Sequence, residues 1–197
     1  MLKTKIAVLV SGGGTNLQAL IDAQSSGIIN SGEIKLVVSS NENAYALQRA
    51  KNAGIKSEIV VKKGNPCFEQ QIIECLEKES IELIVLAGFM CILSENFTNL
   101  YKDRIINVHP SLIPSFCGEG YYGLKVHKAA LDYGVKVTGA TVHFVNEIPD
   151  GGKIILQKAV EIEENDTPET LQKRVMQQAE WEILPLAVEK VCKTINK

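Results

Sequence analysis

The sequence predicts an α/β fold: a Rossmann-like, mostly parallel sheet flanked by helices, with an antiparallel C-terminal strand pair and a long C-terminal helix. Over the first 109 residues, short apolar strand patterns alternate with helical ones, which is typical of a parallel sheet covered by helices. Later in the chain, two strand patterns follow one another and only the turn 149–152 separates them, which indicates an antiparallel pair. A final helical period extends almost to the C-terminus.

Strands are expected where apolar and β-branched residues run together between turn residues. In chain order we expect strands at residues 6–10, 34–39, 58–61, 83–87, 105–109, 138–145 and 154–160. Helices are expected where apolar residues recur at helical spacing, as Leu17, Leu20 and Ile21 do in the first one. The expected helices span residues 15–26, 43–53, 66–78, 126–133 and 167–192. Pro66 should open the third helix, and Pro185 should kink the last.

The composition predicts one domain, 1–197, because 197 residues with 45% hydrophobic content can bury a core. The 21 basic and 23 acidic side chains are interspersed, so we expect no nucleic-acid partner. The five cysteines are odd in number and lack a C-x-x-C pair, which predicts reduced thiols in the cytoplasm. No apolar run approaches the roughly 18 residues of a membrane span. A monomer or a homodimer is expected.

A glycine-rich segment, 11–17 (Ser-Gly-Gly-Gly-Thr-Asn-Leu), lies between the first strand and the first helix. Its backbone N–H groups and the positive end of the helix favour a bound phosphate. Leu17 occupies the third glycine position of the dinucleotide fingerprint, and the P-loop lysine is missing. A phosphomonoester therefore fits better than NAD or ATP. The alternative is a tight turn that binds nothing.

Asn107 and His109 stand two residues apart at the end of an expected buried strand, so both side chains should point the same way. An amide and an imidazole placed together can stabilise a developing oxyanion. Asp150, in the later turn, could reach His109 and favour its charged form. The alternative is an ordinary polar strand end. Thr141 and His143 alternate on the next strand and are as easily explained by packing as by function. His127, on a short helix, is expected at the surface.

Four segments of this chain resemble the folate-dependent formyltransferases: the glycine-rich segment 11–17, Gly-Phe-Met at 88–90, Asn-Val-His-Pro-Ser-Leu at 107–112, and Asp-Gly-Gly at 150–152. The match covers nearly the whole chain, and the glycine-rich segment is most similar to that of members acting in de novo purine synthesis. The resemblance implies that 10-formyltetrahydrofolate donates a formyl group to the amine of glycinamide ribonucleotide. It implies no metal.

The resemblance also implies roles for individual residues. Asn107 and His109 would bind the formyl oxygen as it becomes an oxyanion, while Asp150 would hold His109 as an imidazolium and assist proton transfer through water. The ribonucleotide would be bound by Gly14, Thr15, Asn16, Met90, Pro110 and Glu180, with Gln177 a weaker candidate. The folate would be bound by Phe89, Cys91, Ile92, Leu93, Asn146, Glu147 and Asp150. The implied organisation is a nucleotide-binding half, 1–109, and a folate-site half, 110–197.

The chain departs from the family pattern at several points. Cys91 stands where relatives commonly have an arginine near the folate tail, and Lys153 replaces the proline usual after the Gly-Gly pair. The segment 117–123 differs from the usual Pro-Gly loop, and its glycines predict a mobile flap. Lys62 or Lys63 could substitute for an arginine that some relatives direct at the ribonucleotide, although a lysine pair is usually a solvated surface.

Other functions are compatible with parts of this pattern. A formyltetrahydrofolate hydrolase would share Asn107, His109 and Asp150 and use water as the acceptor, but usually carries an N-terminal regulatory domain. Methionyl-tRNA and sugar-nucleotide formyltransferases usually carry a further domain. A non-catalytic nucleotide-binding module would explain the glycine-rich segment but would not need the three polar side chains together.

Overall fold

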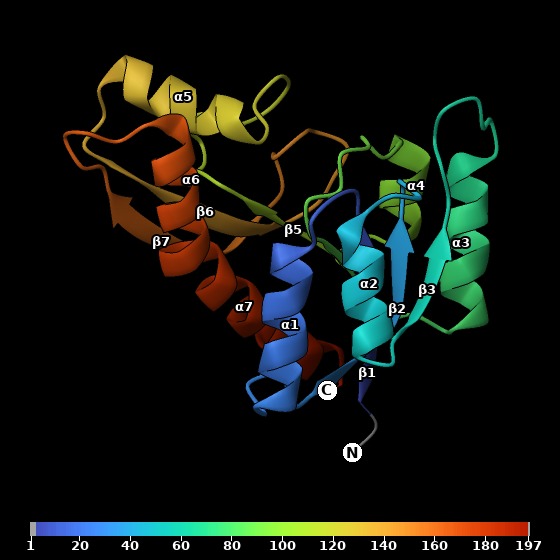
Figure 1. Ribbon diagram of the computed structural model, residues 1–197. Coiled ribbons are helices and arrows are strands. Elements are labelled where there is room, and N and C mark those ends of the chain that lie inside the picture. Colours follow the sequence, from blue (N-terminus) through green and yellow to red (C-terminus); the bar gives the residue numbers. More distant parts are fainter. Residues whose placement is uncertain (1–2, 197) are drawn as a thin grey trace.

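The computed structural model describes residues 3–196. In chain order the elements are β1 (Thr4–Val10), α1 (Thr15–Ser25), β2 (Gly32–Ser39), α2 (Tyr45–Asn52), β3 (Lys56–Ile59), α3 (Phe68–Lys78), β4 (Leu83–Leu86), α4 (Glu95–Leu100), β5 (Ile105–His109), α5 (Leu124–Tyr133), β6 (Val137–Phe144), β7 (Ile154–Glu161), α6 (Pro168–Val175), the π-helical turn η1 (Met176–Glu180) and α7 (Trp181–Ile195) (Figure 1). They build one sheet with the strand order β3-β2-β1-β4-β5-β6-β7. Strands β1 to β5 are parallel, whereas β6 and β7 are antiparallel to their neighbours. The expected fold class is confirmed.

All seven expected strands are present, with bounds within two residues of those expected. The helix α4 was not expected, because its six residues are too few to show a period. The Ser94 hydroxyl caps this helix by accepting a hydrogen bond from the Phe97 N–H at 3.2 Å, and the Phe97 ring is buried. Pro66 was expected as the opening residue of α3, but the helix begins two residues later, at Phe68.

The single C-terminal helix expected over 167–192 is divided in the structure into α6, η1 and α7. The C-terminal helical segment departs from α-geometry at η1, whereas Pro185 lies inside α7 and is buried. A proline ring crowds the carbonyl four residues earlier, which here belongs to Trp181. Because η1 ends immediately before Trp181, the wider turn makes room where the proline needs it.

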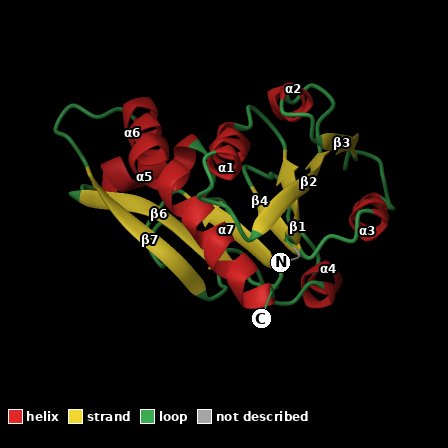
Figure 2. Cartoon of the chain, turned by 90° about the horizontal axis from the view of Figure 1, so that it is seen from below, coloured by secondary structure: helices red, strands yellow, loops and turns green. Residues whose placement is uncertain are grey.

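The sheet separates two hydrophobic clusters (Figure 2). On β1, Ile6 and Val8 face the first cluster, which is covered by α1, α2, α6 and α7. Ala7 and Leu9 alternate with them and face the second cluster, which is covered by α3 and α4. Alternation along each strand therefore decides which layer of helices a side chain meets.

The same alternation positions polar side chains on β5. Ile106 and Val108 pack into the first cluster, so Asn107 and His109 point to the opposite face, as expected from their spacing. Both lie near the carboxyl end of β5, at the edge where the glycine-rich segment leaves β1. Ligands of open α/β sheets bind at this edge.

The two ends of the described chain lie side by side at the opposite edge of the sheet (Figure 1). The Thr4 hydroxyl donates to Asn196 Oδ1 at 3.0 Å, and the Asn196 amide donates to the Ser31 carbonyl at 2.9 Å. Across residues 3–196, none of the helices combines the length and apolarity needed to cross a bilayer.

We predict that Leu76→Ala lowers the free energy of unfolding by about 2–5 kcal/mol, because Leu76 is 1% exposed and its truncation leaves a cavity under α3. Leu100→Ala is the matched control, since Leu100 is 59% exposed, and should change stability by no more than about 0.5 kcal/mol. Urea titrations measure both values. Equal losses in the two variants would show that the second cluster is not a core.

Candidate active site

The glycine-rich segment forms a rigid turn that opens α1. Gly14 caps the helix with a φ of 70°, and a Cβ there would lie 2.7 Å from the Ala46 Cβ. The Gly12 carbonyl accepts from the Ala46 N–H at 3.1 Å, and the Gly13 carbonyl accepts from Arg49 Nε at 2.9 Å. The turn is therefore pinned against α2, and the free N–H groups of the first helical turn form an anion-binding end.

A buried polar pair lies directly behind this turn. The Asn16 amide donates to Glu180 Oε2 at 2.7 Å, and neither side chain is more than 8% exposed. Burial raises the pKa of Glu180 to about 6, although the Asn16 hydrogen bond opposes the shift. The Asn16 carbonyl oxygen is buried without a partner among the described residues. The pair joins the N-terminus of α1 to η1 and leaves a polar atom available for a ligand.

The sequence-predicted ribonucleotide residues gather around this turn. The Met90 N–H donates to the Ser11 hydroxyl at 2.8 Å, which brings the 88–90 segment against the glycine-rich turn. Thr15 approaches Met176 in η1, with its hydroxyl 3.8 Å from the sulfur. Pro110 is partly exposed and directly follows His109 of the polar cluster described below.

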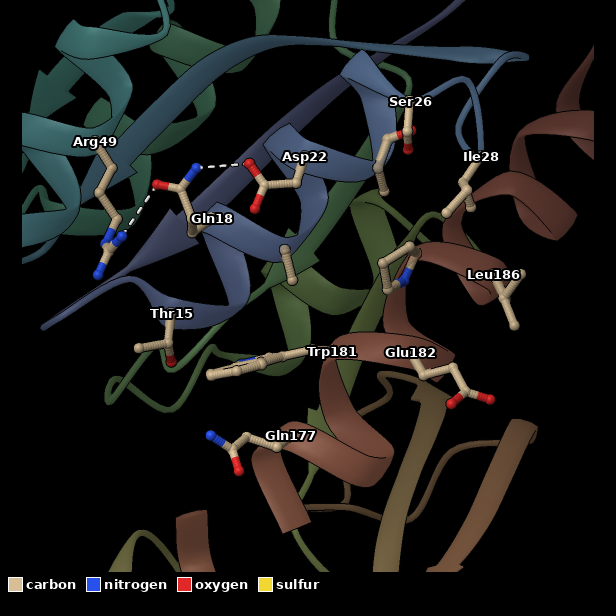
Figure 3. Close-up of a pocket in the computed structure, with 13 residues that line it drawn as sticks. Thr15, Gln18, Asp22, Ser26, Ile28, Arg49, Gln177, Trp181, Glu182 and Leu186 are labelled. Atoms are coloured by element: carbon tan, nitrogen blue, oxygen red, sulfur yellow. Dashed lines mark hydrogen bonds between the residues drawn. The ribbon is translucent and has the colours of Figure 1, made fainter. Parts of the chain in front are cut away.

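A groove of about 600 Å³ runs from Thr15 along α1 and is bounded on the other side by η1 and α7 (Figure 3). Gln177 and Trp181 line the wall formed by η1 and the start of α7, in the lower part of Figure 3, and Arg49 donates to Gln18 at 3.0 Å on the other wall. Gln177 is exposed in this groove, whereas Glu180 is buried against Asn16. Gln177, the weaker candidate for ribonucleotide binding, therefore faces the groove, whereas the Glu180 carboxylate faces Asn16.

The three predicted catalytic residues converge, and a fourth residue joins them. Asp150 Oδ2 lies 3.3 Å from His109 Nδ1, and Asp150 Oδ1 lies 3.5 Å from His143 Nε2. The Asn107 amide contacts the same His143 nitrogen at 3.2 Å. Asp150 therefore bridges two imidazoles, and Asn107 reaches one of them. His143, which the sequence left undecided between packing and function, is part of the cluster.

Burial and hydrogen bonding set the charges in this cluster. Burial opposes ionisation of Asp150, but His143, the charge on His109 and the Gly118 N–H together hold its pKa below the ordinary value. Burial lowers the pKa of His109, while Asp150 and the Phe116 carbonyl act in the opposite direction. Both ring nitrogens of His109 face acceptors, because Nδ1 lies against the Asp150 carboxylate and Nε2 lies against the Phe116 carbonyl. Asp150 favours the protonated form of His109, as expected.

The flap 117–123 and its preceding residue contribute backbone groups that sequence analysis missed. His109 Nε2 lies 2.9 Å from the Phe116 carbonyl oxygen, and the Gly118 N–H donates to Asp150 Oδ2 at 2.9 Å. Phe116 has a φ of 49°, which is unusual for a non-glycine residue. Backbone carbonyls and N–H groups carry no residue-type signal, so no motif could have indicated these contacts.

Thr141 has a structural role. Its hydroxyl donates to the Ser111 carbonyl at 2.7 Å and accepts from the Ile113 N–H at 3.1 Å. Gln157 donates to the same oxygen at 2.9 Å. These bonds tie the loop after β5 to β6 and β7, which fixes the start of the flap.

The expected folate-binding segment divides into buried and exposed residues. Leu93 packs into the second hydrophobic cluster and is 8% exposed, so its side chain is turned away from solvent. Phe89 stacks on Phe68 with ring centroids 6.3 Å apart and is also turned partly toward that cluster. Ile92 is 68% exposed, and Ile148, in the 146–150 turn, is 58% exposed. These two side chains are the accessible apolar surface.

The surface position expected for His127 is wrong. The side chain is fully buried, and neither ring nitrogen has a hydrogen-bond partner in the described part of the chain. Burial lowers its pKa to about 4, so it is neutral at physiological pH.

Comparisons with known proteins agree with this geometry. The formyl transferase family model matches residues 4–188. The phosphoribosylglycinamide formyltransferase of Haemophilus influenzae is 43% identical over 94% of this chain and 85% of its own length. A crystal structure of glycinamide ribonucleotide transformylase 1 from Symbiobacterium toebii superposes with a TM-score of 0.91 at 38% identity, covering 98% of this chain and 89% of that one. The trifunctional purine biosynthetic protein adenosine-3 of Gallus gallus is 44% identical over 96% of this chain, but the chain spans only 18% of its length.

The chain belongs to the formyl transferase family. Within that family, the proteins to which it is similar include several named phosphoribosylglycinamide formyltransferase or glycinamide ribonucleotide transformylase.

We predict a pH-dependent stability contribution from Glu180. Its folded-state pKa of about 6 lies above the ordinary 4.5, so the folded state holds the proton more tightly. The contribution is complete below pH 4.5 and is lost as the pH rises through about 6, which amounts to about 2 kcal/mol. Glu180→Gln removes this dependence, so its stability relative to wild type should rise across that window. Urea unfolding at several pH values tests this, and parallel curves for the two proteins would contradict it.

Proposed function

We propose that this protein transfers the formyl group of 10-formyltetrahydrofolate to the amine of glycinamide ribonucleotide in de novo purine synthesis. The observation that carries the proposal is the convergence of Asn107, His109 and Asp150 at the carboxyl edge of the sheet. A nucleotide-binding module would need the anion-binding turn alone. The five cysteines are free thiols, consistent with a reducing compartment such as the cytoplasm.

The ribonucleotide is proposed to bind between the glycine-rich turn and the catalytic cluster. Its phosphate meets the N–H groups at the start of α1, contributed by Gly14, Thr15 and Asn16. Glu180 and the unpartnered Asn16 oxygen lie deeper and suit ribose or amide groups. Because Glu180 comes from η1 and Asn16 from α1, both halves of the chain build this subsite, and the proposed division at residue 110 is not strict.

The folate is proposed to bind across the other side of Asp150. Ile92 and Ile148 offer apolar surface for an aromatic ring, one on each wall of the proposed folate site. Phe89 and Cys91 pack against the second hydrophobic cluster and support the wall that carries Ile92. Asn146 holds the second wall, because its side-chain oxygen accepts the Ile148 N–H at 3.1 Å. The exposed backbone of Glu147 lies in the same turn and can read the polar edge of a pterin.

The chemistry follows from what the cluster can donate and accept. The amine attacks the formyl carbon, the formyl oxygen gains negative charge, and the donor nitrogen leaves with a proton as tetrahydrofolate forms. Asn107 and His109 are the proposed donors to that oxygen. In the structure Asn107 Nδ2 lies 3.2 Å from His143 Nε2 and His109 Nε2 lies 2.9 Å from the Phe116 carbonyl oxygen, so the formyl oxygen would displace these two contacts.

Proton transfer is assigned to His109 and Asp150. His109 takes part through the N–H that it directs at the oxyanion, while the proton that the attacking amine releases passes through water beside Asp150 to the leaving folate nitrogen. The Asp150 carboxylate, 3.3 Å from Nδ1, stabilises the charged ring without taking the proton permanently, because its own pKa is held low.

The proposal predicts that the protein, mixed with glycinamide ribonucleotide and 10-formyltetrahydrofolate, converts both into formylated ribonucleotide and tetrahydrofolate. Loss of the formyl donor is followed by absorbance, and the product by mass spectrometry. Loss of donor at the same rate without the ribonucleotide would identify a hydrolase. No loss in either mixture would leave a binding module as the better explanation.

We predict that Asn107→Ala and His109→Ala each lower kcat about a hundredfold or more, since each removes a preorganised donor to the oxyanion. Asn99→Ala, on the exposed side of α4, is the matched control and should retain full turnover. Steady-state kinetics at saturating substrates measure these values. Turnover near wild type in both active-site variants would refute the assignment.

Asp150→Asn should lower turnover and move the His109 limb of the pH–rate profile to lower pH. The direction follows because Asp150 raises the pKa of His109 against the effect of burial, and the amide cannot. An unchanged limb would show that Asp150 does not act through His109.

A further inference from the structure

A second cleft, of about 430 Å³, lies away from the catalytic edge. It is formed by the start of β7, the end of β6, the loop before β5 and the last turns of α7. In Figure 2 the C-terminal end of α7 comes down beside the ends of these strands. We call it the basal cleft and define it by Arg104, Phe144, Lys153, Ile154, Lys190 and Val191.

Three cations from three different elements converge on the basal cleft. None of Arg104, Lys153 and Lys190 forms a salt bridge with any carboxylate among residues 3–196. Arg104 donates only to the Glu82 carbonyl at 3.2 Å, and Lys190 approaches the Ile155 carbonyl at 3.5 Å. Asp103 is the one carboxylate in the lining. The cleft therefore has an excess of positive charge with unused N–H donors.

The floor of the basal cleft is apolar. Phe144, Ile154 and Val191 contribute a ring and branched side chains beneath the three cations. A cleft of this volume falls within the size range of small-molecule sites, and apolar walls with a few convergent polar groups are their usual composition. The combination fits a flat, apolar ring system that carries one anionic group.

Phe144 connects the basal cleft to the catalytic cluster. Its carbonyl oxygen lies 2.8 Å from His143 Nδ1, and the opposite nitrogen of His143 faces Asp150 and Asn107. The β6–β7 pairing has an irregularity between Val142 and His143, next to this contact. Gly152 packs so closely on the Phe144 carbonyl that a Cβ would overlap it. A ligand packed on the Phe144 ring therefore acts on the peptide that orients His143.

We propose that the basal cleft binds a small aromatic anion, of about the size of a mononucleotide, through Lys153, Lys190 and Arg104, and that its occupancy is transmitted to His143 through Phe144. The site is separate from the proposed formyl-transfer cleft, and its binding test does not require that activity. The anionic group meets the cations, and the ring replaces water on Phe144 and Ile154.

Binding is tested with two aromatic anions: anilinonaphthalene sulfonate, followed by fluorescence, and adenosine monophosphate, followed by calorimetry. Adenosine is the neutral control, and inorganic phosphate is the control without a ring. Both aromatic anions should bind, and each ringless or neutral arm should bind at least about tenfold more weakly. Lys153→Met/Lys190→Met should weaken the aromatic anions about tenfold or more. Lys51→Met/Lys173→Met removes the same charge from exposed positions outside the cleft and should leave binding within about twofold.

Equal binding to both double variants would overturn the site, as would phosphate binding as tightly as the aromatic anions. Transmission is read from the imidazole signals of His143 in nuclear magnetic resonance spectra. These signals should move on addition of adenosine monophosphate to the wild type and remain in place in Lys153→Met/Lys190→Met. Unmoved signals in a wild-type protein shown to be saturated would overturn the link through Phe144.

Discussion

The Asp150 carboxylate is the contact on which the arrangement of the site depends. It meets His109 from β5, His143 from β6 and the Gly118 N–H from the flap, so three segments are positioned by one side chain. Asp150 itself adopts a φ of 56° in the turn between β6 and β7. The antiparallel strand pair thus holds an acid over the end of a parallel strand, and the conformation of that turn determines whether the acid meets the two imidazoles.

Two acids near the site have opposite pKa shifts: Asp150 is partly buried, whereas Glu180 is buried. Asp150 accepts hydrogen bonds or charge from three groups, and they outweigh burial, so its pKa falls. Glu180 has one donor, Asn16, which does not compensate for burial, so its pKa rises to about 6. The deeper burial of Glu180 and the larger number of groups that stabilise the Asp150 carboxylate together explain the two directions. Asp150 is therefore suited to keep a negative charge, whereas Glu180 can change its protonation state when a ligand binds.

Much of this arrangement could be predicted from the sequence, because alternation and spacing are local signals. The two-residue spacing of Asn107 and His109 predicted their common direction, and glycines marked the turns that carry the phosphate-binding N–H groups and Asp150. The contacts of the Phe116 carbonyl could not be predicted, since a backbone atom has no residue-type signature. The burial of His127 depends on how α5 packs, which a short helical pattern does not determine. The position of η1 could not be predicted either, because it depends on where the helix accommodates Pro185.

The pairing of Thr4 with Asn196 places both ends of the described chain together, across the sheet from His109. Additional polypeptide joined at either end would emerge at the amino end of the parallel strands. It would therefore leave the proposed site at their carboxyl end unobstructed. Such an exit suits a unit carried within multienzyme chains, as in the adenosine-3 proteins, where the similar region occupies less than a fifth of the length. Other domains can be joined at this position without changes to the loops around the proposed site.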